Sequence, residues 1–252
     1  MKHFRIKNLF MALVLFLSLL VLSLAHAENY HVAFVYDGDT ILLQNGTKVR
    51  YLGIDTPEID HENGNDEPFS QEARDLNREL VNMKTITLEY DRQTKDRYKR
   101  TLAYVFMENG EMVNALMVKS GLAYVVTYKP NLRYRSYLIN VQRQAIRERL
   151  GIWQNLPVEE KTEYRGNRKS FRFHRKNCPS GRQIPINNRV PFRSMYDAFW
   201  DGYSPCHRCL PRWFEKTARF DFNPITPPQE RRESTSETPH PASLPQGSGR
   251  GK

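Results

Sequence analysis

The chain has few cysteines and only one long hydrophobic run. Its 252 residues include three cysteines, so any disulfide within the chain leaves one thiol unpaired. Outside residues 9–24, no apolar stretch is long enough to cross a bilayer. From residue 221 onward apolar residues nearly vanish, which predicts a disordered tail over 220–252. We therefore expect a soluble protein without stable membrane association once the N-terminal run is removed.

The N-terminal run has the organisation of a signal peptide. Lys2, Arg5 and Lys7 precede the apolar residues, and the small-x-small site Ala25-His26-Ala27 follows them. This pattern predicts a signal peptide over 1–27 and an exported protein, periplasmic or secreted. An uncleaved membrane anchor is the alternative, although the run is short for a membrane span.

After the N-terminal run, acidic residues are scarce mainly in the C-terminal part of the chain. The formal net charge is +10. Residues 28–155 contain 17 Lys and Arg against 18 Asp and Glu, whereas residues 161–219 contain 14 against 4. Attraction for a polyanion should therefore be concentrated in the C-terminal part. We expect that part to act as a nucleic-acid tether, separate from the active site.

Two acidic motifs are joined by a short predicted hairpin. The motif DGDT (37–40) includes Asp39, and DTPE (55–58) includes Asp55, Thr56 and Glu58. Asn-Gly at 45–46, between two strand-like segments, is a strong hairpin signal that brings both strand ends together. Carboxylates that close repel one another unless a cation lies between them, which favours a metal site. Turn aspartates without a metal are the alternative.

The segment around these motifs predicts an α+β fold. Strands are expected at 31–36, 40–43, 48–54, 85–90 and 101–107, as short antiparallel strands of a small closed barrel. Helices are expected from Ser70 as N-cap, at 112–119 with Gly121 as stop, and at 133–150 with Gly151 as stop. The arginines of the third helix, at 135, 143 and 147, are most simply a solvated face.

A third motif, DRYKR (96–100), leads into the last of these strands. The set DGDT, R-x₄-DTPE and DRYKR, in this order, resembles the staphylococcal nuclease family over about residues 30–155. The resemblance implies an OB-fold and cleavage of DNA and RNA alike, leaving 3′-phosphate ends. It also implies the roles of six residues, with Asp39, Asp55 and Thr56 holding Ca²⁺ and Arg50, Glu58 and Arg100 in catalysis.

Exposed aromatic residues of OB-folds can stack on bases. Tyr98, Tyr124 and Tyr128 are therefore candidate substrate contacts, with half-buried packing as the alternative. We favour Tyr98 and Tyr128 as the substrate-binding pair.

The C-terminal cysteines have the spacing of a metal site. His174-x₃-Cys178 and Cys206-x₂-Cys209 supply four nitrogen and sulfur ligands, as tetrahedral Zn²⁺ requires. Residues 171–212 resemble the metal-binding domain of the Ada DNA-repair proteins, in which the first ligand is a methyl-accepting cysteine. His174 stands at that position, so methyl transfer is not expected. The alternative is a Cys206–Cys209 disulfide or redox pair that leaves Cys178 free.

The sequence predicts a nuclease OB-fold domain over 28–156, a linker over 157–169 and a zinc module over 170–219. The predicted function is that of an exported, monomeric, calcium-dependent endonuclease acting on DNA and RNA without sugar specificity. Two other classes remain open. One is a nucleic-acid-binding module with an inactive site. The other is a thiol oxidoreductase, although no thioredoxin-like βαβ pattern surrounds the Cys-x₂-Cys pair.

Overall fold

The computed structural model describes residues 28–60, 64–154, 156 and 162–210. The expected signal peptide, the expected tail and part of the expected linker lie outside these residues. Within the described part, none of the helices has the length and apolar character that crossing a bilayer requires.

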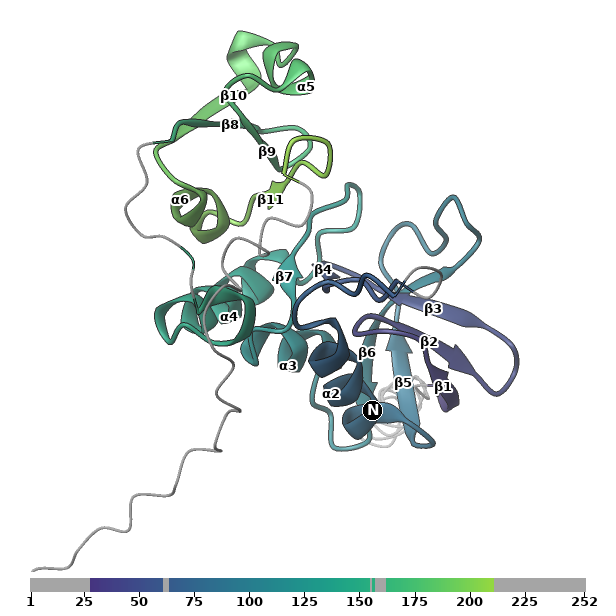
Figure 1. Cartoon of the computed structure of the whole chain (residues 1–252). Coiled ribbons are helices and arrows are strands. Elements are labelled where there is room, and N and C mark those ends of the chain that lie inside the picture. The colour runs from purple at the N-terminus through teal and green to yellow at the C-terminus, as the bar shows by residue number, and fades with distance from the viewer. Residues whose placement is uncertain (1–27, 61–63, 155, 157–161, 211–252) are drawn as a thin grey trace, which may run out of the picture. The chain divides into compact units, whose positions relative to one another are not determined.

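Five strands close into a barrel in the order β1-β2-β3-β6-β5 (Figure 1). They are β1 (Asn29–Val35), β2 (Thr40–Leu43), β3 (Lys48–Tyr51), β5 (Thr85–Glu89) and β6 (Thr101–Met107). The closed barrel expected from the sequence is confirmed, and so is the α+β class. The expectation of antiparallel pairing throughout is wrong, because β3 and β6 run parallel. Parallel neighbours need a crossover connection, which here contains a helix and β5.

The strand expected over 48–54 is interrupted within its length. It ends at Tyr51, and Gly53 takes a positive φ of 79° that other residues rarely adopt. The chain resumes as β4 (Ile54–Asp55), which pairs with β7 (Tyr124–Val125) outside the barrel. This change of direction places Asp55 opposite Tyr124 in the register.

Three helices accompany the barrel, namely α2 (Ser70–Val81), α3 (Val113–Lys119) and α4 (Arg135–Arg147), followed by the 3₁₀ turn η1 (Gly151–Trp153). Ser70 is the first helical residue and not the N-cap, which is Phe69 in the left-handed region. Gly121 follows α3 with a φ of 73°, as the sequence predicts for a helix stop. Helix α4 ends three residues before the expected position, and Arg149 makes the turn with a φ of 53°.

The C-terminal part contains a four-stranded sheet in the order β10-β8-β9-β11 (Figure 1). Its strands are β8 (Tyr164–Asn167), β9 (Arg172–Arg175), β10 (Arg189–Phe192) and β11 (Ser204–Pro205). The shorter elements α5 (Pro179–Arg182), η2 (Ile186–Asn188) and α6 (Met195–Trp200) lie between the strands in sequence. Strand β8 falls within the segment 157–169 that the sequence predicts as linker.

The arginine face of α4 is covered by α6 and its neighbours. Arg143 donates from Nε to the Trp200 carbonyl at 2.8 Å. The Arg135 guanidinium lies 4.1 Å from the Phe171 ring centroid, a cation–π contact. The expectation of a solvated face is wrong for Arg135 and Arg143, which contact the C-terminal sheet and its helices, which we call the C-terminal module, whereas Arg147 is exposed.

A hydrophobic core continues from the nuclease-like segment into the C-terminal module. Phe199 of α6 is fully buried and meets the Trp153 ring at a centroid distance of 5.0 Å and the Tyr124 ring at 6.0 Å. Gln142, buried in α4, donates to the Phe199 carbonyl at 2.7 Å. Residues 162–210 therefore share their core with the chain that precedes them.

Candidate functional site

The DGDT loop is pressed against helix α2. A Cβ atom at Gly38 would lie 2.8 Å from both the Ala73 Cβ and the Thr56 Cγ2, so only glycine fits this approach. The Asp37 carboxylate accepts from the Asp39 backbone N–H at 2.9 Å, which closes the turn. The loop therefore fixes the direction of the Asp39 side chain.

Arg50 joins the two acidic motifs. Its guanidinium makes ion pairs with Asp39 and with Asp55. The other oxygen of Asp55 accepts from the Tyr124 hydroxyl at 2.6 Å, and Asp39 Oδ2 accepts from the Thr56 N–H at 3.1 Å. The protein thus orients both carboxylates through its own donors.

Asp39 is crowded by negative charge. The residue is 2% exposed, and burial raises the pKa of Asp39 well above its ordinary value. Arg50 opposes this shift, while the carboxylates of Asp37, Asp55 and Glu58 add to it. A further cation beside these oxygens relieves that repulsion, and oxygen-only donors are those that hard cations prefer.

A pocket of about 570 Å³ opens beside these carboxylates. Its lining contains seven of the residues expected to act in the nuclease site: Arg50, Asp55, Thr56, Glu58, Tyr98, Arg100 and Tyr128. Asp39 is the one expected nuclease-site residue outside the lining, and its ion pair with Arg50 places it directly behind the wall. One concave surface therefore gathers residues of the R-x₄-DTPE and DRYKR motifs, with Asp39 of DGDT behind its wall.

Glu58 has an environment that suits proton transfer. Burial of its carboxylate, with Asp55 and Asp37 nearby, raises the pKa of Glu58 to about 7. The residue itself is exposed and lines the pocket. The Glu58 backbone N–H donates to Glu67 Oε2 at 2.8 Å and so fixes the local chain. A carboxylate with a pKa near neutrality can accept a proton at neutral pH.

Arg100 is held by a second carboxylate. Its Nε donates to Asp96 Oδ2 at 2.7 Å, and the same Asp96 accepts from the backbone N–H groups of Tyr98 and Arg100. The DRYKR motif is thus a loop closed on its own aspartate. This leaves Arg100 at the pocket wall as a charged donor.

The three tyrosines considered as base contacts differ in exposure. Tyr98 is 63% exposed and Tyr128 is 60% exposed, so both present their rings to solvent beside the pocket. Tyr124 is 3% exposed. The expectation that it could stack on a base is wrong, because its ring is in the core and its hydroxyl orients Asp55.

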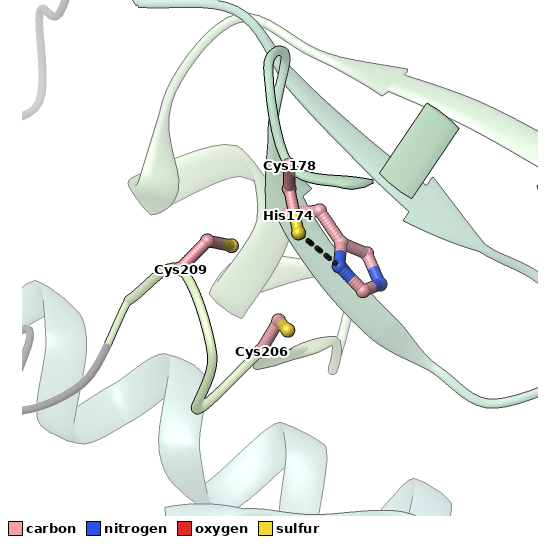
Figure 2. Close-up of side chains that lie close together, drawn as sticks. All are labelled: His174, Cys178, Cys206 and Cys209. Atoms are coloured by element: carbon pink, nitrogen blue, oxygen red, sulfur yellow. Dashed lines mark hydrogen bonds between the residues drawn. The ribbon is translucent and has the colours of Figure 1, made fainter. Parts of the chain in front are cut away.

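Figure 2 shows His174, Cys178, Cys206 and Cys209 facing a common centre. The four ligand atoms lie within 4.8 Å of one another, and Cys178 Sγ is 3.5 Å from His174 Nδ1. Ligands of a tetrahedral zinc ion are about 3.5–4 Å apart, given the usual bond lengths. The four donors therefore fit Zn²⁺ with only small adjustments.

The ionisation of His174 and Cys178 also suits a metal, whereas burial raises the pKa of the Cys209 thiol to about 12. Burial lowers the pKa of His174, with help from Arg172 and Arg165, so the ring is held in its neutral, ligating form. Burial works against ionisation of Cys178, but hydrogen bonds from the backbone of Gly181 and Ser180 lower its pKa overall. All three cysteines are free thiols, and the alternative Cys206–Cys209 disulfide is not formed.

The sequence gives no signal that His207 belongs to the pocket. His207 lines the pocket although it stands between two cysteines of the candidate zinc cluster. Only the packing of the C-terminal module against the barrel brings it there, and no local pattern signals that packing. The expectation that this module lies apart from the active site is therefore wrong.

Known proteins resemble the first part of the chain. The family described as "Staphylococcal nuclease homologue" matches residues 48–155. The "Thermonuclease" of Staphylococcus hyicus is 40% identical over 137 residues, which is 53% of this chain and 80% of that protein. The "Thermonuclease" of Staphylococcus intermedius is 38% identical over 130 residues, 50% of this chain and 77% of that protein. "Endonuclease YncB" of Bacillus subtilis is 40% identical over 122 residues, 46% of this chain and 57% of that protein.

Proposed function

Because the chain belongs to the staphylococcal nuclease family, we propose that it is an exported, calcium-dependent endonuclease that hydrolyses DNA and RNA without sugar specificity. The thermonuclease and endonuclease relatives indicate a hydrolase of the nuclease class. The observation that carries the proposed mechanism is the pocket that joins Arg50, Glu58 and Arg100. Export is proposed from the N-terminal sequence pattern alone.

In the proposed reaction a water oxygen attacks the phosphorus of the scissile phosphodiester. Glu58 accepts the proton of that water, as its raised pKa allows. Arg50 and Arg100 donate paired hydrogen bonds to the phosphate oxygens, on which negative charge increases. The P–O5′ bond breaks, which leaves a 3′-phosphate and a 5′-hydroxyl whose proton comes from solvent.

We assign a calcium site to Asp39, Asp55 and Thr56. The fit rests on the donor set, since hard carboxylate oxygens crowd a buried position where Asp37 and Glu58 add further negative charge. When bound, Ca²⁺ supplies positive charge that stabilises the phosphate in the transition state. Arg50 keeps Asp39 and Asp55 side by side, and Tyr124 fixes the second oxygen of Asp55.

We assign a structural zinc ion to His174, Cys178, Cys206 and Cys209, on the basis of their closeness and their ligand chemistry. This zinc takes no part in the reaction. Tyr98 and Tyr128 are proposed to stack on bases that flank the scissile phosphate, since their exposed rings lie at the pocket.

A plasmid-nicking assay tests the proposal. The full chain should nick supercoiled DNA with Ca²⁺ and lose this activity in EGTA, even when Mg²⁺ is supplied. Asp39→Ala should weaken calcium binding, measured by calorimetry, together with cleavage. Digestion of labelled DNA and RNA of one sequence, side by side, measures sugar specificity. Full cleavage in EGTA with Mg²⁺ would contradict the assignment of calcium.

A further inference from the structure

The pocket at the barrel has a wall from the C-terminal module. Pro205, His207 and Leu210 line it together with the catalytic candidates described above. His207 Nε2 is 3.9 Å from Asp55 Oδ2, and the His207 side chain is 65% exposed. An exposed imidazole thus stands at the same carboxylate that Arg50 and Tyr124 hold.

Arg172 of β9 fixes the position of this wall. One nitrogen of its guanidinium donates to the Pro205 carbonyl at 3.0 Å and lies 3.3 Å from His207 Nε2. The other donates to the hydroxyl of Tyr128, whose ring centroid is 5.1 Å from the guanidinium carbon. Arg172 therefore ties the loop that carries His207 to a loop of the nuclease-like segment.

The proposed zinc site includes two cysteines of the loop that carries His207. Cys206 and Cys209 flank His207, so a metal bound to both thiols fixes the backbone at either side of the imidazole. The shared core around Phe199 and the hydrogen bond from Gln142 to the Phe199 carbonyl keep the module against α4. The wall is thus attached to the barrel by packing and not by a linker alone.

We propose that the loop 206–209 is a functional wall of the nuclease pocket, and that His207 is a substrate-binding residue which zinc holds in place. This inference rests on the proposed nuclease function. His207 lies beside Asp55 and lines the pocket with the residues proposed to hold the phosphate, so we expect a ring N–H to donate to a phosphate oxygen of the bound strand. A tether would depend on the net positive charge of the C-terminal module. The proposed contact depends on a hydrogen bond from His207.

The first experiment separates a wall from a tether. Steady-state kinetics of the full chain are measured with Ca²⁺ and a labelled single-stranded oligodeoxynucleotide. His207→Ala should raise KM about tenfold, the usual cost of one hydrogen bond to a charged group, with kcat little changed because only binding is lost. His207→Gln keeps an N–H donor and should recover most of the loss, whereas His207→Phe should not.

Arg208→Ala is the matched control. Arg208 is the exposed neighbour of His207 between the same cysteines, and it does not line the pocket. A tether that works by charge predicts a higher KM and a smaller salt dependence for Arg208→Ala, and no effect for His207→Ala. That pattern would overturn the proposal.

The second experiment tests the role of zinc. Cys206→Ser should lose zinc, measured by elemental analysis, and should raise KM as His207→Ala does. If zinc acts by holding His207, the double variant Cys206→Ser/His207→Ala should have the same KM as Cys206→Ser alone. Additive losses in the double variant would show that zinc and His207 act independently, against the proposal.

A binding measurement keeps the test decisive if Cys206→Ser does not fold. In the full chain carrying Glu58→Gln, affinity for the same labelled oligodeoxynucleotide is measured by fluorescence anisotropy, with and without His207→Ala. Affinity should fall about tenfold on loss of the imidazole, and an unchanged affinity would overturn the inference. Absence of cleavage by the wild-type chain in Ca²⁺ would instead count against the proposed function, since the binding measurement needs no turnover.

Discussion

The carboxylate site and the Cys/His cluster are held together in different ways. Asp39 and Asp55 are oriented by an arginine, a tyrosine hydroxyl and a backbone N–H, all from chain that packs on the barrel. The cluster joins two distant segments, 174–178 and 206–209. The two segments are connected by strands β9 and β11, which pair with each other over only two residues.

This difference suggests that the carboxylate site serves the reaction and that the Cys/His cluster serves the stability of the fold. The carboxylate site has an internal substitute for a cation in Arg50, so removing one of its groups should change turnover more than fold. We expect the cluster to depend on the proposed zinc ion for cross-linking, because such a short strand pair is weak by itself. Substitutions at the first site should therefore appear in kcat, and substitutions in the module should appear in stability or in KM.

The largest effect is expected for Glu58→Gln. The amide cannot accept the proton of the attacking water, so turnover should fall about 10²–10⁴-fold. Zinc content and melting temperature should not fall, because Glu58 belongs to the carboxylate site alone. Rapid-quench measurement of kcat, with elemental analysis of the same sample, checks both parts. Near wild-type turnover would remove Glu58 from the mechanism.

Arg50→Lys should come next. One ammonium cannot donate in parallel to Asp39 and Asp55, as the guanidinium does. We expect kcat to fall about 10²-fold, typical of losing a donor to the developing charge. Arg100→Lys is the control, since Arg100 pairs with Asp96 and not with the metal-ligand candidates. Both variants should lose turnover, but only Arg50→Lys should also alter calcium affinity, measured by calorimetry.

The pH profile gives a smaller and more graded effect. Glu58 must be ionised to act as base, and its pKa is raised to about 7. Below that pKa, kcat/KM should fall about tenfold per pH unit, and it should level off above it. Bound Ca²⁺ favours the carboxylate and should move the midpoint toward the ordinary value of 4.5. A profile that stays flat across this range would show that Glu58 does not titrate during the reaction.

The same raised pKa predicts a dependence of stability on pH. A carboxyl group whose pKa is higher in the folded state binds more protons when folded, so stability falls as pH rises from 4.5 to about 7. This loss should be seen in calcium-free protein by thermal unfolding. It should be smaller in Glu58→Gln, which has no proton to release.

The sequence predicts the barrel strands because the residue types and turns that define them lie close together in the chain. The bounds of β2 and β6 agree with the sequence prediction, because β-forming residues run through both strands and the Asn45-Gly46 turn follows β2 closely. The parallel pair β3–β6 was missed, because pairing partners so far apart in sequence leave no periodic signal. The roles of Tyr124 and His207 were missed for the same reason, since both depend on contacts made after folding.

The smallest effect is expected in the C-terminal module, for Ser194→Ala. Ser194 is the buried N-cap of α6, and its Oγ accepts from the Asp197 N–H at 3.0 Å. Losing this cap should cost about 1 kcal/mol of folding free energy, or a few degrees in Tm for a domain of this size, about 2–4 °C. Ser194→Asp retains an acceptor and should keep most of that stability.

This variant also tests how far the two regions fold as one. Helix α6 carries Phe199, which packs on Trp153 of the nuclease-like segment. Because that core is shared, near-UV circular dichroism and zinc release, followed with a colorimetric dye, should both shift to the same lower temperature in Ser194→Ala. The value of kcat, measured well below that temperature, should not change. If zinc release shifted while the remaining structure melted at its original temperature, the C-terminal module would be an independent folding unit. The catalytic residues and the proposed zinc site would then belong to separate folding units.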